Sequence, residues 1–154
     1  MRPACSRWAV RWCPRPWIRN EVRLVERPPT PDAYARLRDA VGWNEVDAAG
    51  VAEGLRATLF SVCLELDGET IGCGRVVGDG GIYFYLQDVI VRPEQQGRGY
   101  GRLIMGALMG FLDRTARPGA FVGLMAATGV AAFYERYGFA PRPEGRPGMY
   151  RVWE

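Results

Sequence analysis

Apolar and polar positions divide the first third of the chain into one strand and two helices. Residues 21–26 alternate charged and apolar side chains, which predicts a first strand that the following prolines end. Thr30-Pro31 predicts a helix start, with the threonine as cap and the proline in the first helical position. Gly42-Trp43-Asn44 ends this helix, and residues 47–57 predict a second, shorter one.

Three β-rich stretches follow, separated by tight turns. Residues 58–66, 69–78 and 82–91 read as strands, and Asp67-Gly68 and Asp79-Gly80-Gly81 supply the turn residues between them. This spacing predicts three consecutive antiparallel strands. The third is apolar on both faces near its end, as expected for a central strand.

Helical and strand-like stretches alternate in the last third of the chain. Apolar residues at helical spacing over 101–115 predict an amphipathic helix that packs on the sheet. Residues 120–125 predict a short buried strand, 130–137 a helix and 149–153 a final strand. The predicted fold class is therefore α/β (α+β mixed): a twisted mixed sheet of about six to seven strands with about four helices on both faces.

Composition and charge indicate one globular domain with a basic extension. The chain has 154 residues, 48% of them hydrophobic and 24% charged, and no apolar run approaches the roughly 20 residues of a membrane span. Residues 1–20 hold five Arg and no acid, giving +5, whereas the remaining 15 Arg and 17 acids give −2. We expect residues 1–20 to be a poorly ordered extension or the product of a start placed too early, and residues 21–154 to be a single domain. Nucleic-acid binding through the extension is the alternative, and the extension lacks the apolar core of a secretory signal.

The absence of His and the spacing of Cys exclude several chemistries. Without His there can be no Ser-His-Asp or Cys-His catalytic pair and no His-containing zinc site. Cys5, Cys13, Cys63 and Cys73 lack the paired C-x-x-C spacing of a zinc site. We expect no metal, and reduced structural thiols in a cytoplasmic protein. Whether Cys63 and Cys73 face each other depends on a strand register that the sequence does not give.

Residues 86–102 form a strand, a glycine-rich loop and a helix start, which is the layout of an anion site. Glycines let the backbone approach a ligand, and the first amides of a helix have no intrahelical acceptor. A Walker-type phosphate loop is excluded because the chain contains no Lys. The dinucleotide fingerprint fits poorly, since the sixth position is Arg102 counting from Gly97 and Ile104 counting from Gly99.

The residues of this loop spell Gln96-x-x-Gly99-x-Gly101 directly after a strand, and this resembles the GNAT superfamily of N-acetyltransferases. A second segment of that family is matched by residues 127–139, which include Phe133-Tyr134-Glu135-Arg136-Tyr137-Gly138-Phe139. Many members carry Asn seven positions before the Tyr, and here that position is Ala127. The resemblance therefore does not imply the contact such an Asn makes to the cofactor.

The resemblance implies an acyltransferase that moves the acetyl group of acetyl-CoA to a primary amine of a small molecule, aryl-alkylamine or polyamine-like. A non-catalytic acyl-CoA-binding sensor is the alternative, and a homodimer is a possible assembly. In the family, the strand backbone meets the pantetheine arm and the loop holds the pyrophosphate. The implied cofactor-binding residues are Val89, Ile90 and Val91, with the Val89 amide facing the thioester oxygen, followed by Gln96, Gly97, Arg98, Gly99, Tyr100, Gly101 and Arg102.

The resemblance also implies the residues that move protons. Tyr134 is the predicted general acid, because a phenol with a pKa near 10 is protonated at neutral pH and can protonate a departing thiolate. Residues 85–89 resemble a Tyr-Leu-Glu-Asp stretch of polyamine and diamine acetyltransferases, with Gln87 at the Glu position, so Asp88 is the predicted base. Glu65 and direct proton loss to water are the alternatives. Successive strand residues point to opposite faces, so Gln87 and Asp88 need not share the cleft.

Aromatic and soft side chains suggest an acceptor pocket that tolerates apolar or aromatic amines. The predicted substrate-binding residues are Trp43, Tyr85 and Gln87, and Tyr83, Met149 and Tyr150 are further candidates in the same regions.

Overall fold

A computed structural model describes residues 21–153 of the chain. The Arg-rich residues 1–20, with the expectations attached to them and to Cys5 and Cys13, lie outside the described range. The elements are β1 (Arg23–Val25), α1 (Pro31–Ala40), α2 (Ala48–Arg56), β2 (Phe60–Leu66), β3 (Glu69–Gly78), β4 (Tyr83–Val91), the 3₁₀ turn η1 (Pro93–Gln95), α3 (Tyr100–Thr115), β5 (Phe121–Gly123) and α4 (Ala131–Glu135).

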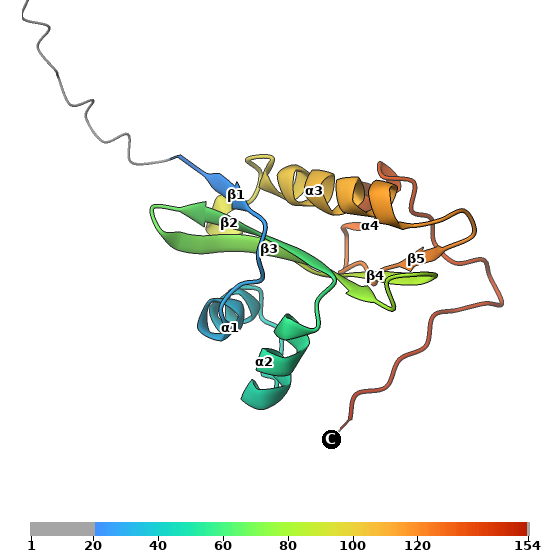
Figure 1. Cartoon of the computed structure of the whole chain (residues 1–154), viewed down its shortest axis with the longest axis horizontal. Coiled ribbons are helices and arrows are strands. Elements are labelled where there is room, and N and C mark those ends of the chain that lie inside the picture. Colours follow the sequence, from blue (N-terminus) through green and yellow to red (C-terminus); the bar gives the residue numbers. More distant parts are fainter. Residues whose placement is uncertain (1–20, 154) are drawn as a thin grey trace, which may run out of the picture.

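One mixed sheet separates two layers of helices. Its strand order is β1-β2-β3-β4-β5, with every neighbouring pair antiparallel except β4 and β5, which are parallel. Helices α1 and α2 lie on one face, and α3 and α4 lie on the other (Figure 1). This arrangement confirms the predicted mixed α/β fold class.

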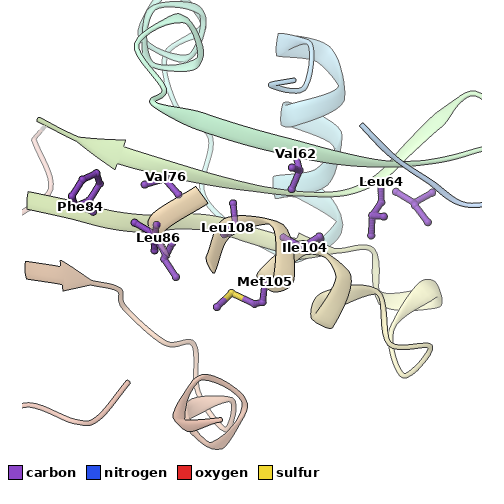
Figure 2. Packing of buried hydrophobic residues seen from close by; sticks show 10 residues of the cluster. Val62, Leu64, Val76, Phe84, Leu86, Ile104, Met105 and Leu108 are labelled. Atoms are coloured by element: carbon purple, nitrogen blue, oxygen red, sulfur yellow. The ribbon is translucent and has the colours of Figure 1, made fainter. Parts of the chain in front are cut away.

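The larger hydrophobic core lies between the sheet and α3 (Figure 2). It is formed by Val62, Leu64, Ile71, Val76, Phe84, Leu86, Ile104, Met105, Leu108 and Leu112. A smaller cluster of Leu37, Cys63, Cys73 and Ile90 lies on the α1 face, with Trp43 packed against it. Each helix layer thus buries its own apolar surface against the sheet.

Local chemistry explains where several elements begin and turn. The Thr30 hydroxyl accepts a hydrogen bond from the Ala33 amide at 3.2 Å, so it caps α1 as predicted. Asp67 and Gly68 both have positive φ, 51° and 85°, which is the backbone of a type I′ hairpin turn between β2 and β3.

Two glycines of β3 stand where the structure has no room for a side chain. A Cβ at Gly74 would lie 2.4 Å from the Ile104 Cγ2 atom, and one at Gly72 would lie 2.8 Å from the Ile90 carbonyl oxygen. Neither distance leaves room for a methyl group. Gly74 therefore sets how closely α3 approaches the sheet, and Gly72 sets how closely the backbone of β4 approaches β3.

The predicted strand over residues 149–153 is wrong. These residues form no strand, and the side chains of Met149 and Trp153 are 89% and 79% exposed. A strand needs a partner to satisfy its backbone, and here no described segment pairs with residues 149–153. The sheet accordingly has five strands and not six or seven.

The structure also gives the register that the sequence left open. Cys63 and Cys73 are direct partners across β2 and β3, and both are free, fully buried thiols. Burial raises the pKa of Cys63 to about 11 and the pKa of Cys73 well above its ordinary value. Both side chains are therefore neutral parts of the smaller core.

Candidate functional site

The loop between η1 and α3 presents unpaired amides at a helix start. Gly97 and Gly99 have φ of 76° and 86°, a conformation that favours glycine, and Gly99 is the N-cap of α3 without any side-chain cap. Within the described part of the chain, the amides of residues 97–101 donate to no protein acceptor. The first turn of a helix also carries partial positive charge, so this loop can bind an anion such as a pyrophosphate.

Polar side chains hold and surround this loop. The Gln96 Nε2 donates to the Val91 carbonyl oxygen at 2.9 Å, which ties the loop to the end of β4. The Arg102 guanidinium folds back over the loop, with Nη2 lying 3.2 Å from the Cβ position of Gly99. Arg98 is exposed on the loop. Both arginines are placed where they can reach a phosphate that the amides bind.

The last part of β4 has an open backbone edge. Only Tyr83, Phe84 and Tyr85 pair with β5, whereas β3 pairs with β4 as far as Val91. From Leu86 onward, no described strand lies against the other side of β4. Its backbone groups there are available to an extended ligand that adds to the sheet edge and continues into the glycine loop.

A β-bulge at Asp88 and Val89 interrupts this strand. Gln87 lies opposite Arg75 and Ile90 lies opposite Cys73, so two residues of β4 oppose the single residue Gly74. Asp88 has a φ of 54°, in the left-handed region that only glycine adopts easily. The bulge interrupts the usual alternation of side chains between the two faces of the strand. As a result the side chains of Gln87 and Asp88 meet, and the Gln87 Nε2 donates to the Asp88 Oδ1 atom at 3.2 Å.

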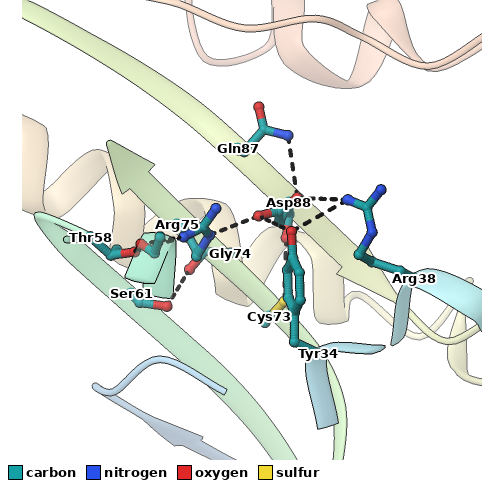
Figure 3. Close-up of polar contacts among 10 residues, drawn as sticks. Tyr34, Arg38, Thr58, Ser61, Cys73, Gly74, Arg75, Gln87 and Asp88 are labelled. Atoms are coloured by element: carbon teal, nitrogen blue, oxygen red, sulfur yellow. Dashed lines mark hydrogen bonds and ion pairs between the residues drawn. The ribbon is translucent and has the colours of Figure 1, made fainter. Parts of the chain in front are cut away.

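The carboxylate of Asp88 lies in a buried polar network on the α1 face of the sheet (Figure 3). Its side chain is fully buried, and Oδ2 accepts from the Arg75 Nε at 2.7 Å and from the Tyr34 hydroxyl at 3.0 Å. An Arg38 Nη1 atom lies 3.9 Å from Oδ1. Burial and the nearby Asp88 carboxylate raise the pKa of Tyr34, so this phenol stays protonated and donates.

The sequence did not reveal Tyr34, Arg38 and Arg75 as members of this network. Arg75 offers one signal, since it is a lone charge within the otherwise uncharged stretch 71–78. A charged residue at such a position requires a buried partner.

Tyr134 lies on α4 among aromatic rings. Its ring meets that of Phe133 edge-on, with centroids 5.1 Å apart, and lies 6.4 Å from the ring of Phe139. Phe133 in turn packs against the start of α3, its ring 3.4 Å from the Cβ position of Gly101. The Tyr134 hydroxyl has no hydrogen-bond partner in residues 21–153, and burial raises the pKa of this phenol.

The candidate acceptor-binding residues are only partly brought together. Trp43 packs near Ile90, with the Arg38 guanidinium 5.3 Å from its ring centre, and Gln87 joins the Asp88 network. Tyr85 is half-buried at the end of the β4 and β5 pairing. The structure places Met149 and Tyr150 elsewhere, in an exposed segment, and Tyr83 is 59% exposed.

Residues 21–153 contain neither a cluster of metal ligands nor a membrane-spanning helix. No three His, Cys, Asp or Glu side chains in this range gather closely enough to hold a metal ion. None of its helices is both long and apolar enough to cross a bilayer.

The fold and this site define an acyltransferase, with an open strand edge that leads into an anion-binding helix start. Residues 58–141 match the family model of the acetyltransferase (GNAT) domain, which is more than half of the chain. The chain therefore belongs to the GNAT superfamily of N-acetyltransferases.

Individual relatives agree with this membership. The chain is 31% identical over 119 residues to the uncharacterized N-acetyltransferase ycf52 of Porphyra purpurea, covering 75% of this chain and 67% of that protein. It is 34% identical over 82 residues to serotonin N-acetyltransferase 2, chloroplastic, of Oryza sativa subsp. japonica, covering 53% of this chain and 40% of that protein. A solved Staphylococcus aureus structure described as a probable acetyltransferase superposes with a TM-score of 0.82 at 32% identity, covering 86% of this chain and all of that one.

Proposed function

We propose that this protein transfers the acetyl group of acetyl-CoA to a primary amine of a small molecule. The observation that carries the proposal is the open edge of β4, which runs directly into the unpaired amides of residues 97–101. Acetyl-CoA has a matching shape, since its pantetheine arm offers amides to a strand edge and its pyrophosphate suits a helix start. In this pose the backbone of Val89, Ile90 and Val91 binds the arm.

The pyrophosphate would be bound mainly by main chain. The amides around Gly97 and Gly99 provide the fixed dipoles, and Tyr100 and Gly101 begin the helix whose free amides point at the anion. Arg98 and Arg102 add charge-assisted hydrogen bonds. Gln96 keeps the loop attached to the end of β4 through its bond to the Val91 carbonyl oxygen.

In the proposed reaction the neutral amine attacks the thioester carbonyl carbon. The negative charge that develops on the carbonyl oxygen is stabilised by the Val89 amide at the bulge. The carbon–sulfur bond then breaks, and Tyr134 gives its proton to the departing thiolate. The nitrogen, which gained a positive charge in the attack, releases one proton to water as the amide forms, and a proton from water restores the Tyr134 phenol. Burial raises the pKa of Tyr134, so the phenol is fully protonated over the neutral range in which the enzyme would work.

The contacts of Asp88 argue against the base role that the sequence predicted for it. Its buried carboxylate already accepts hydrogen bonds from Arg75, Tyr34 and Gln87, so little acceptor capacity remains for a substrate proton. Glu65, the reserve candidate, lies on β2 and forms an ion pair with Arg27, and β3 separates it from β4. We therefore propose that the acceptor ammonium loses its proton to water.

The charge near the bulge favours an aryl-alkylamine over a polyamine. Two arginines, Arg38 and Arg75, surround the single carboxylate of Asp88, which leaves a net positive charge that repels a second ammonium group. Trp43, packed against the smaller core, and the half-buried Tyr85 offer aromatic surface for such an amine. The rice relative is named for serotonin, an aryl-alkylamine, which agrees with this preference. A homodimer and a cytoplasmic location stay predictions from the sequence.

A product assay tests the proposal. The full chain is incubated with acetyl-CoA and aryl-alkylamines, polyamines, amino acids, aminoglycosides or peptide N-termini, and acetylated amine is measured by mass spectrometry. We expect turnover with aryl-alkylamines to exceed that with polyamines. We expect Tyr134→Phe to lower kcat at least tenfold, a lower bound set beneath the roughly 10²–10⁴-fold that acid–base catalysis contributes. Saturable acetyl-CoA binding without product from any amine would instead identify a sensor module.

A further inference from the structure

The buried polar network around Asp88 lies at the β4 bulge, and none of its side chains has a role in the proposed reaction. Asp88 holds a left-handed backbone conformation with φ of 54°, although it is not glycine. Such a conformation persists only where the surroundings determine it. The groups that face its carboxylate are Tyr34 and Arg38 from α1, Arg75 from β3 and the neighbouring Gln87.

Arg75 makes the closest of these contacts. Its Nε lies 2.7 Å from the Asp88 Oδ2 atom, and its side chain is only 10% exposed. Behind the same bulge, the Cys73 thiol donates to the Asp88 carbonyl oxygen at 3.4 Å. The side chain and the carbonyl of Asp88 are thus both held from β3.

Arg75 also reaches the helical layer beyond the sheet. Its Nη1 donates to the Gly54 carbonyl oxygen at 3.0 Å and to the Thr58 hydroxyl at 2.8 Å. Gly54 lies in the last turn of α2, and Thr58 lies between α2 and β2. One guanidinium therefore joins the bulge to the end of α2. Figure 3 shows its contacts with Asp88 and Thr58.

We infer that Arg75 is a positioning residue for acetyl transfer: through Asp88 it fixes the β4 bulge that aims the Val89 amide, and through Gly54 and Thr58 it locks that bulge to α2. The inference rests on the proposed function. It assigns Asp88 to the same positioning role, and neither residue exchanges a proton with the substrate. A planar guanidinium with Nε and Nη1 donating in two directions is required, which a lysine ammonium cannot reproduce.

Kinetics of Arg75→Lys and Arg75→Gln test this role, with Arg23→Gln, an exposed strand arginine on β1, as the matched control. We expect both Arg75 variants to lose at least tenfold in kcat, while the Kd for CoA rises by a smaller factor, because the amides of residues 97–101 that bind the pyrophosphate are retained. The pH profile of kcat should keep its shape in these variants and in Asp88→Asn. The control should match the wild type.

Arg75→Gln leaves a buried carboxylate without its closest partner and can fail to fold. The double variant Arg75→Gln/Asp88→Asn removes both charges, so it keeps the test valid; we expect it to fold and still lose at least tenfold in kcat. A folded Arg75→Lys or double variant with full kcat would overturn the inference. The inference would also be overturned if the pH profile of kcat lost its acidic limb in Asp88→Asn, because that result would identify Asp88 as the base.

A second readout separates this inference from the proposed function. Hydrogen exchange of the peptide that contains residues 87–91 needs no turnover, and we expect it to rise at least tenfold in folded Arg75→Lys and to stay unchanged in Arg23→Gln. If the wild type acetylates no amine, the proposed function fails while this exchange still reports whether Arg75 holds the bulge. Unchanged exchange in Arg75→Lys contradicts the inference.

Discussion

Replacing Gly74 with Ala would place a methyl group between β3 and α3. The new Cβ would lie 2.4 Å from the Ile104 Cγ2 atom and 3.0 Å from the Leu108 Cδ1 atom. Both partners are fully buried. Carbon atoms in contact are normally about 3.5 Å or more apart, so the closer pair overlaps by about 1 Å.

The cost follows from how this clash can be relieved. Cγ2 is attached to the Cβ of Ile104, so it cannot swing away as the end of a flexible chain can, and either Ile104 or α3 must shift. Overpacking of this kind costs about 1–3 kcal/mol of unfolding free energy. Ile104→Ala alone leaves a cavity and costs about 2–5 kcal/mol. In the double variant Gly74→Ala/Ile104→Ala the new methyl group occupies part of that cavity. The loss of unfolding free energy in the double variant should therefore be smaller than the sum of the two single losses by about 1 kcal/mol or more.

Urea unfolding followed by circular dichroism measures these differences. Gly106→Ala is the matched control, because a Cβ there meets nothing within 4 Å and Ala is favoured in a helix; it should stabilise by about 0.5–1 kcal/mol. Ile104→Val retains a methyl at Cγ2, so it should give the Gly74 variant little relief. A Gly74→Ala protein as stable as the wild type, or strict additivity with Ile104→Ala, would refute the packing argument.

Three further predictions concern the Thr30 cap, the buried thiols of Cys63 and Cys73, and the Tyr134 phenol. Thr30→Ala removes the α1 cap and should cost about 0.5–2 kcal/mol in urea unfolding; an unchanged midpoint would mean that the cap contributes nothing. Cys63 and Cys73, whose pKa values burial raises, should resist a thiol reagent at pH 8 in the native protein and add two reactive thiols on unfolding; native labelling of either would contradict this. Burial raises the pKa of Tyr134, so acid catalysis should persist up to its ordinary pKa near 10, and an activity that falls between pH 7 and 9 by loss of this proton would count against it.

Features set by neighbouring residues could be predicted from the sequence. Thr30-Pro31 and Asp67-Gly68 carry their own cap and turn chemistry, and the structure places a helix start and a hairpin there. The loop before α3 could also be predicted, because its left-handed backbone positions are occupied by glycines, Gly97 and Gly99, directly before a helical pattern. Most predicted strands and helices therefore agree with the structure to within a few residues.

Features that depend on distant contacts could not be predicted in this way. The bulge at Asp88 is held by Arg75, 13 residues away, and by Tyr34, 54 residues away. Strand alternation alone predicts that Gln87 and Asp88 separate, whereas the bulge brings their side chains into contact. Residues 149–153 show the opposite case, a strand-like pattern for which the described chain supplies no pairing partner.

Hydrogen exchange with and without acetyl-CoA tests the central claim most directly. The amides of residues 97–101 have no protein acceptor, and those on the outer edge of β4 have no partner strand, so bound acetyl-CoA should slow their exchange. We expect protection of the peptides that cover residues 87–102, saturating with acetyl-CoA, and no change in β1. Absence of saturable binding, or protection confined to another part of the chain, would contradict the account.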